Sequence, residues 1–407
     1  MDKKIHRFPP SLHGLKLYST PKAVSIGPYH RDLIRVKDMQ KVKKVAAHHF
    51  VKQSGRPFKD IYKDVAEAAG AASDFYASNE VQGMGDDEFA NMMFLDGCFL
   101  LQYMVSTGFG KLNPSLMSFF ETNQAVISED IMLLENQLPW VVLTTLREFM
   151  NPPNPLLVKD FVAKMGRTLQ ARKDKEDEPF DYGSYSPPHL LGRLWYYKTT
   201  RQSPTDEVII DVTDEVIIDV QDGKPMPKSI SAIELAEIGI GLKASKTAKF
   251  SDMDIKKVPL FAKIVLAPLL LDQVRSSWLI NMVAFEVCMS MGTAGRPDKP
   301  SPVVCSYLAI LAMLMDREED VHKLRADHIV QGELTNKEML DFFKTVIKHI
   351  SGGDPYLHIM EEVEDYKLKW WMWIIVYQFF YKNRKTIAAV LSAVGVLVGI
   401  LKAAYRK

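Results

Sequence analysis

The most regular pattern of apolar and polar positions lies in Ile127–Leu146, with the sequence ISEDIMLLENQLPWVVLTTL. Ser128 is a residue type that begins helices, and the two acidic residues after it suit the positive end of a helix dipole. Pro139 ends or bends such a helix and is suited to the first turn of another. The pattern therefore predicts two buried helices joined at a fixed bend, with an apolar stripe of Ile131, Leu133, Leu134, Leu138, Trp140, Val141, Val142, Leu143 and Leu146.

Further stretches have apolar residues at helical spacing or are apolar almost throughout. Two sequences, beginning at Ser231 and at Thr335, have the capping-box form in which a glutamate follows three residues after the hydroxyl. These patterns predict a mainly α protein with a single large helical domain over residues 1–365. The other predicted helices are Leu33–Lys52, Asp60–Ala77, the buried Phe89–Val105, a long helix around 271–289 and the core segment Val303–Met315.

Residues 171–230 interrupt this helical pattern and indicate a loop-rich insertion. Within it, the acidic and apolar sequence Asp206–Val212 is repeated as Asp214–Val220. The eight-residue period is even, so a strand alternation would survive the duplication. We therefore expect a local tandem duplication in a tolerant loop, with a short β hairpin as the structure that it would form.

The C-terminal region is apolar and basic. Residues 366–385 form an aromatic and basic juxtamembrane segment, and residues 386–405 are predicted to form a transmembrane helix that anchors the chain to membrane lipid. The alternative is a helix rich in small residues that packs on the body. The predicted anchor residues are Ile387, Val390, Leu391, Val394, Val396, Leu397, Val398, Ile400 and Leu401. Because no signal peptide is recognisable, we expect a protein of the plasma membrane or an endomembrane with its body in the cytosol.

Charge is distributed unevenly along a chain whose overall composition is ordinary for a folded protein. Residues 1–63 carry a net charge of +11 and residues 366–407 a net charge of +8, which leaves −18 for the remainder. The basic N-terminal region, with Lys41, Lys43 and Lys44, is therefore an alternative candidate for peripheral binding of anionic lipid. The simpler interpretation is a basic helix face against an acidic body, and that acidic body argues against nucleic acid as a partner.

Recognisable catalytic chemistry is missing from the sequence. It contains no phosphate-binding loop, nucleophile elbow or zinc-protease motif, and its three cysteines are widely spaced in apolar surroundings. We therefore predict no catalytic, cofactor-binding or metal-binding residue. Four polar residues in apolar contexts are instead expected to form a structural polar lock, namely Asp96, Glu135, Asn136 and Gln137. The alternative hypothesis is an enzyme of unknown reaction that uses Asp96 and Glu135.

Several short sequences together resemble one known family. They are Val24–His30 (VSIGPYH), Met92–Leu101 (MMFLDGCFLL), Asp130–Trp140 (DIMLLENQLPW), Ser231–Leu235 (SAIEL) and Val283–Cys288 (VAFEVC), followed by the apolar C-terminal helix. In order and spacing the chain resembles the plant family called domain of unknown function 247. Lys256–Leu271 departs from the usual family pattern.

The resemblance implies a mainly helical plant protein with one C-terminal membrane helix and no established enzyme activity. Some grass members of the family are linked to pollen–stigma self-incompatibility, a role that would require evidence from the genetic locus. Together with the missing motifs, the resemblance favours a membrane-anchored interaction or recognition protein with an unknown protein partner. The sequence does not predict its oligomeric state.

Overall fold

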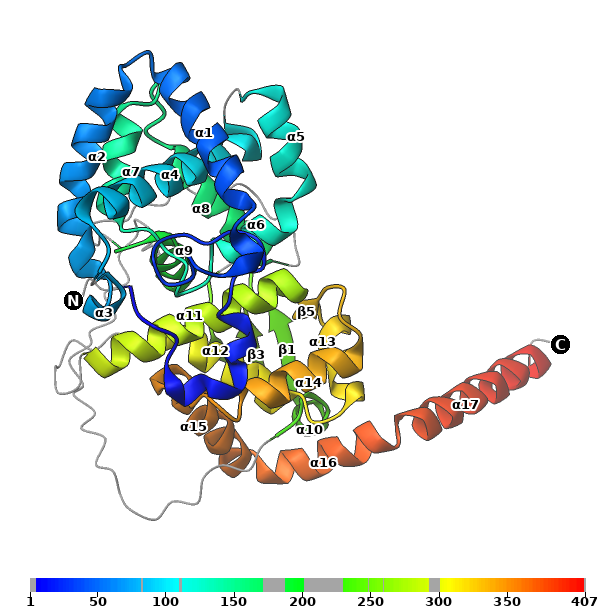
Figure 1. The fold of residues 1–407 in the computed structure, drawn as a ribbon. Coiled ribbons are helices and arrows are strands. Elements are labelled where there is room, and N and C mark those ends of the chain that lie inside the picture. The colour runs from blue at the N-terminus through cyan, green and yellow to red at the C-terminus, as the bar shows by residue number, and fades with distance from the viewer. Residues whose placement is uncertain are drawn as a thin grey trace, which may run out of the picture.

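The computed structural model describes residues 5–81, 83–109, 112–170, 187–200, 230–247, 249–258, 260–292 and 301–405. The chain is mainly helical, as predicted, and its helices form two groups on either side of the long helix α11 (Gln273–Gly292) (Figure 1). The first group contains α1 (Met39–Ser54), α2 (Phe58–Ala72), α3 (Ser78–Val81), α4 (Asp86–Met104), α5 (Pro114–Thr122), α6 (Gln124–Asp130), α7 (Trp140–Glu148), α8 (Leu157–Thr168) and α9 (Leu190–Thr199). The second contains α10 (Ala232–Glu237), α12 (Val303–Leu314), α13 (Glu318–Ala326), α14 (Asn336–Val346) and α15 (Asp354–Lys369). Short 3₁₀ turns span Pro10–Tyr18, Ile34–Val36 and Ser73–Phe75, and a π turn spans Val105–Phe109.

One continuous apolar core joins the two groups of helices. Helices α4 and α12 are buried on almost every side, as their near-uniform apolar sequences predicted. The N-terminus of α12 is closed by a buried carboxylate from α11. Glu286 accepts hydrogen bonds from the backbone N–H groups of Val304 and Cys305, each at 2.9 Å, and from the indole N–H of Trp195 at 2.7 Å. This one side chain therefore connects α9, α11 and α12.

The two predicted capping boxes are confirmed. At α10, the Ser231 hydroxyl accepts from the Glu234 N–H at 3.3 Å, and the Glu234 carboxylate accepts from the Ser231 N–H at 2.9 Å. At α14, Thr335 and Glu338 make the same pair of bonds at 3.2 and 2.8 Å. Both helices thus begin where the local sequence alone provides the hydrogen bonds.

A small sheet was not predicted from the sequence. Its three strands have the spatial order β1 (Ile240–Ala244), β3 (Phe261–Leu266), β2 (Asp254–Val258). Strands β1 and β3 are parallel, with Ile240 opposite Ala262, and β2 and β3 are antiparallel, with Val258 opposite Phe261. A second parallel pair joins β4 (Leu269–Leu270) to β5 (Val330–Gln331). The predicted hairpin of residues 206–220 lies outside the described residues.

The predicted helix over the first half of Ile127–Leu146 is wrong. Helix α6 ends at Asp130, and the chain continues through turns to Pro139, after which α7 begins as predicted. The reason is that side chains replace the helical hydrogen bonds. The Gln137 carboxamide donates to the carbonyl groups of Ile131 and Leu133 at 2.8 Å, and the Asn136 carboxamide donates to the carbonyl of Asp130 at 2.8 Å.

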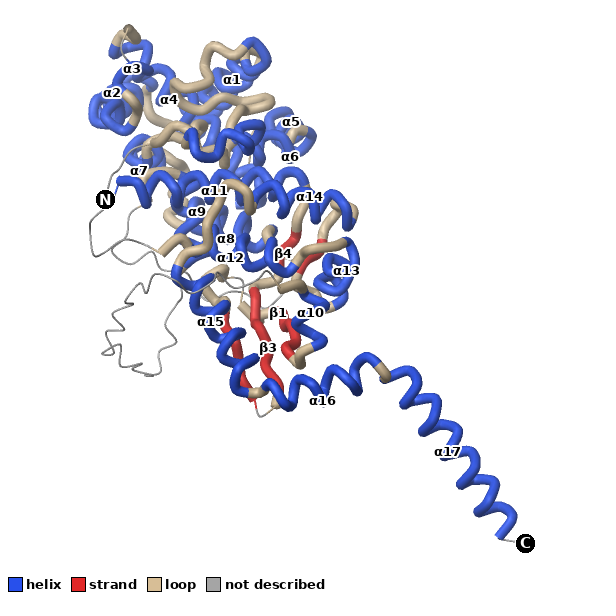
Figure 2. Tube along the Cα trace, turned by 90° about the horizontal axis from the view of Figure 1, so that it is seen from below, coloured by secondary structure: helices blue, strands red, loops and turns tan. Residues whose placement is uncertain are grey.

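Helices α16 (Trp371–Lys382) and α17 (Arg384–Tyr405) follow α15 at the C-terminus. Helix α16 lies along the edge of the second group, and α17 projects away from the body in both views (Figures 1 and 2). Helix α16 is fastened by one face: the Trp373 indole donates to the carbonyl of Leu260 at 2.8 Å, and the Phe261 ring meets the rings of Trp373 and Tyr377 edge to face.

The predicted transmembrane helix is wrong. Within the described part of the chain, none of the helices is both long enough and apolar enough to pass through a bilayer. Helix α17 has 22 residues, but its sequence contains Arg384 and Lys385 at the start and Lys402 near the end. The uncharged run between these basic residues falls short of the ~17–20 residues that a span requires. The prediction of a membrane anchor at Ile387–Leu401 is therefore wrong. The predicted lipid partner and membrane localisation rested on this anchor and are wrong with it.

Candidate functional site

Three segments that are distant in sequence meet in a buried polar network at the centre of the first group of helices. They are the extended chain of residues 22–30, the turns of residues 130–137 and the middle of α4 at Asp96. Neither of the first two segments forms regular helix or strand over most of its length. Their buried backbone groups therefore need partners from side chains.

Asp130 and Asn136 supply most of these partners. The Asp130 carboxylate accepts from the backbone N–H groups of three consecutive residues, 22, 23 and 24, at 2.7–2.8 Å. Burial raises the pKa of Asp130 to about 6, against the effect of those three hydrogen bonds. The Asn136 carboxamide accepts from the Ile26 N–H at 2.5 Å and donates to the carbonyl of Val24 at 2.9 Å. The extended segment is thus bound as if by a neighbouring strand.

Asp96 forms a fully buried ion pair with Lys43 of α1. The Lys43 Nζ lies 2.5 Å from Asp96 Oδ1, and the two side chains are 1% and 2% exposed. Lys43 also donates to the carbonyl of Ser25, and Asp96 Oδ2 accepts from the Gly27 N–H at 2.8 Å. Burial raises the pKa of Asp96, although Lys43 and Gly27 act in the opposite direction. The pair connects α1 to α4 and positions the segment between them.

Gly27 occupies a position that other residues would fit poorly. Its φ is +73°, and a Cβ atom there would lie 2.8 Å from the hydroxyl of Tyr76 and 3.0 Å from the carbonyl of Gln137. The glycine therefore permits both the left-handed turn and the close approach of the two irregular segments.

Glu135 lies at the edge of the network, where the N-terminal chain crosses it. Its carboxylate accepts from the Phe8 N–H at 2.8 Å, lies 3.0 Å from His30 Nε2 and 3.5 Å from a guanidinium nitrogen of Arg7. Burial by itself would raise the pKa of Glu135, but the hydrogen bonds from His30 and Phe8 and the charge of Arg7 outweigh it and leave the pKa below its ordinary value.

Gln137 and Asn281 complete the network on the side of α9 and α11. Besides the two carbonyl groups named above, Gln137 accepts from the Leu191 N–H at 2.9 Å through its Oε1. Asn281 of α11 accepts from the Leu134 N–H at 2.8 Å and donates to the carbonyl of Tyr18 at 2.8 Å. Each carboxamide thus uses both its donor and its acceptor on buried backbone groups.

The structure brings Asp96, Glu135, Asn136 and Gln137, the four residues of the predicted polar lock, into this one network. Sequence reasoning missed Lys43, Asp130, His30 and Asn281 as members. A signal existed for Lys43, because it follows Met39 by four residues on the apolar stripe of α1 and is therefore on the buried face. The alternative assignment of Lys43 to a lipid-binding surface is contradicted by this burial, whereas Lys41 and Lys44 are exposed.

The chemistry open to the network is limited by its own hydrogen bonds. Asp96 and Glu135 are each engaged by a cation and by a backbone N–H, and burial raises the pKa of the Cys288 thiol to about 12. The cysteines are free and buried. Among the described residues, no group of three or more His, Cys, Asp or Glu side chains is arranged to hold a metal ion.

A second notable feature is an apolar face of α16 that none of the described segments covers. Its residues are 45–66% exposed and recur at helical spacing, as Trp371, Met372, Ile375, Val376, Phe379 and Phe380. Adjacent positions on such a stripe lie on one side of the helix. The opposite side carries Trp373, Ile374 and Tyr377, which contact the body. Large exposed apolar patches are rare on monomeric proteins and mark interaction surfaces.

Together, the fold and the network define a mainly helical protein whose central polar groups organise irregular backbone. The family model described as plant protein of unknown function (DUF247) matches residues 5–398, and the chain belongs to this family. A relative from Arabidopsis thaliana, named UPF0481 protein At3g47200, is 27% identical over 392 residues, which cover 90% of this chain and 78% of that protein. No solved structure matches the chain significantly.

Replacing Lys43 by Met is expected to lower the free energy of unfolding by about 3–5 kcal/mol, because the Asp96 carboxylate would be buried without its cation. The double variant Lys43→Met, Asp96→Asn should lose less than the sum of the two single variants, since it leaves no unpaired charge. Urea denaturation of the four proteins measures this coupling. The matched control is Lys44→Met, one position along α1 and exposed, which should change stability by less than ~0.5 kcal/mol. Additive losses would contradict the buried pair.

Replacing Glu135 by Gln is expected to lower the free energy of unfolding by about 1–3 kcal/mol at pH 7, because a charged acceptor is lost. The pKa of Glu135 is lower in the folded protein than its ordinary value of 4.5, so its contribution is complete above that value and is lost as the pH falls through the folded pKa. The difference in the free energy of unfolding between the wild type and Glu135→Gln, measured by urea denaturation, should therefore become smaller from pH 7 to pH 3.5.

The control for this prediction is Glu67→Gln, an exposed position on α2. It should leave stability within ~0.5 kcal/mol of the wild type at both pH values. A gap for Glu135→Gln that stayed constant or widened in acid would show that the ionised carboxylate is not what stabilises the fold.

Proposed function

We propose that this protein is a binding module that recognises a partner protein through the apolar face of α16, and that it catalyses no reaction. The observation that carries the proposal is the face itself, formed by Trp371, Met372, Ile375, Val376, Phe379 and Phe380. Exposing these side chains costs about 25 cal/mol for each Å² of apolar surface that a partner could cover. Aromatic residues and Met are also the types enriched in the centre of protein interfaces.

The way in which α16 is attached supports recognition by a rigid surface. The contacts of Trp373 with the carbonyl of Leu260 and with the Phe261 ring fix one side of the helix on the turn between β2 and β3. Tyr366 of α15 donates to the same carbonyl at 2.9 Å. The opposite, apolar side therefore needs little ordering when a partner binds, which reduces the entropic cost of association.

Charge around α16 indicates the chemistry of the partner. Residues 366–385 contain five basic residues and no acidic residue. Lys369 and Lys382, near the two ends of the helix, are exposed. An amphipathic helix with an apolar stripe flanked by acidic residues would cover the apolar face and place its charges near these cations. We therefore assign the face to an acidic amphipathic helix of another protein.

The buried network supports a role without catalysis. Its two candidate catalytic carboxylates, Asp96 and Glu135, are used to satisfy backbone groups of residues 27 and 8. Pollen–stigma recognition would be one particular case of partner binding, and evidence for it has to come from the genetic locus.

The test uses a synthetic helical peptide with Leu on one face and Glu on the other, and a matched peptide in which every Glu is Lys. Fluorescence anisotropy should show that the Glu peptide binds the full chain and that the Lys peptide binds at least about tenfold more weakly. The double variant Ile375→Ser, Phe379→Ser should bind the Glu peptide at least about tenfold more weakly than the wild type, because both side chains lie in the apolar face.

Ile34→Ser is the control, because Ile34 is an apolar residue that is exposed to 83% and lies outside α16. It should bind the Glu peptide like the wild type. Equal binding of the two peptides, or full binding by the double variant, would refute the proposal. Light scattering provides a further check: a dimer that dissociates in the double variant would assign the face to a second copy of this chain instead.

A further inference from the structure

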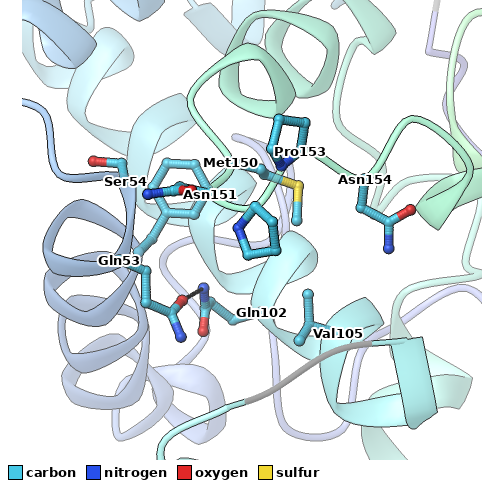
Figure 3. A pocket seen from close by; sticks show the side chains of 10 residues that line it. Gln53, Ser54, Gln102, Val105, Met150, Asn151, Pro153 and Asn154 are labelled. Carbon is cyan, nitrogen blue, oxygen red and sulfur yellow. Dashed lines mark hydrogen bonds between the residues drawn. The ribbon is translucent and has the colours of Figure 1, made fainter.

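A pocket of about 540 Å³ opens between α1, the end of α4 and the loop from α7 to α8, away from α16 (Figures 1 and 3). One wall is the last turn of α1 with Gln53 and Ser54, and the other is the loop Met150–Asn154. Gln102 and Val105 lie between these walls. The volume is in the range of sites that bind small molecules.

The lining of this pocket combines apolar surface with uncharged polar groups. Among the residues that the structure describes, ten line it, and none of these ten is charged: Phe50, Gln53, Ser54, Gln102, Val105, Met150, Asn151, Pro152, Pro153 and Asn154. Four of the ten carry carboxamides, which can both donate and accept hydrogen bonds. A charged ligand would lose hydration here without gaining a counter-charge from these ten residues, so the described lining favours neutral molecules.

Gln102 provides the second observation. It is 2% exposed, and its Nε2 donates to Gln53 Oε1 at 2.9 Å, the bond drawn in Figure 3. Its other polar atom, Oε1, is screened from solvent and accepts no hydrogen bond from the described residues. A buried acceptor without a donor costs free energy, and most such groups in folded proteins have a partner. A small rotation of the terminal carboxamide, whose torsion is broad, would present Oε1 to a ligand.

We propose that this pocket is a binding site for a small neutral ligand that combines an apolar group with an N–H or O–H donor. The donor would bind Oε1 of Gln102, and the apolar group would lie against Phe50, Val105 and Met150. Ser54 is committed elsewhere, because its hydroxyl donates to the carbonyl of Val51 at 2.7 Å. We assign the specificity-determining contact to Gln102, because its buried Oε1 accepts no hydrogen bond from the described residues.

Three probes of nearly the same shape test the proposal: benzamide, which is neutral, benzoate, which is anionic, and benzylammonium, which is cationic. Binding to the full chain is measured by protein-observed NMR at millimolar probe concentrations. We expect benzamide to bind and the two charged probes to bind at least about tenfold more weakly. Equal affinity for the three probes, or no binding by any of them, would overturn the proposal.

Two variants of this chain sharpen the test. Gln102→Leu should weaken the binding of benzamide at least about fivefold. Its melting temperature should stay equal or rise, because a buried acceptor without a donor is removed. Val105→Phe, which adds volume between the two walls, should also weaken the binding of benzamide. Gln124→Leu, at an exposed position on α6, is the matched control and should bind benzamide like the wild type.

The combination of lost binding and retained stability in Gln102→Leu is the result that supports the site, since a merely structural role for Gln102 would lower stability instead. Undiminished benzamide binding by Gln102→Leu would overturn the assignment of the donor contact. Because α16 is distant from the pocket, the α16 variant Ile375→Ser, Phe379→Ser should bind benzamide normally, which keeps this outcome independent of partner binding.

Discussion

Buried irregular backbone is the constraint on which the rest of this structure depends. Residues 22–30 and 131–139 run through the core without the ladders of a helix or sheet, yet their N–H and C=O groups cannot be left without partners there. Asp130, Asn136 and Asp96 provide those partners, and Asp96 in turn requires the ammonium group of Lys43. The arrangement of α1, α4, α6 and α11 around these segments follows from that requirement, because each helix contributes a side chain at a fixed place.

A network of this kind has a consequence for function. Its carboxylates have perturbed pKa values, a property that is common in active sites, but here the perturbation has a structural cause in burial and backbone hydrogen bonds. Groups that are already saturated by the protein have little capacity left for a substrate. The two features to which we assign binding lie elsewhere, on the outer face of α16 and in the pocket beside Gln102.

These two features differ in the kind of partner to which we assign them. The α16 face is apolar and has the exposed Lys369 and Lys382 near its two ends, and we assign it to an acidic surface of a macromolecule. The described lining of the pocket is uncharged, and we assign the pocket to a small neutral molecule. The elements that form the pocket, α1, α4 and the chain from α7 to α8, lie on the other side of α11 from α16 (Figure 1).

Local sequence determined the elements whose hydrogen bonds are local: the capped starts of α10 and α14, the start of α7 after Pro139, and the uniformly apolar α4 and α12. The helix predicted for Ile131–Leu138 was wrong, because a helical stripe cannot reveal that the side chains of Asn136 and Gln137 will hydrogen-bond the backbone carbonyl groups of the preceding residues. Local sequence also misjudged the C-terminal helix, where the basic residues at both ends leave too short an apolar run to span a bilayer. The partners of Asp96, the pairing of β1 with β3 and the unpaired oxygen of Gln102 were decided by tertiary structure alone, since each depends on residues that only folding brings within hydrogen-bond distance.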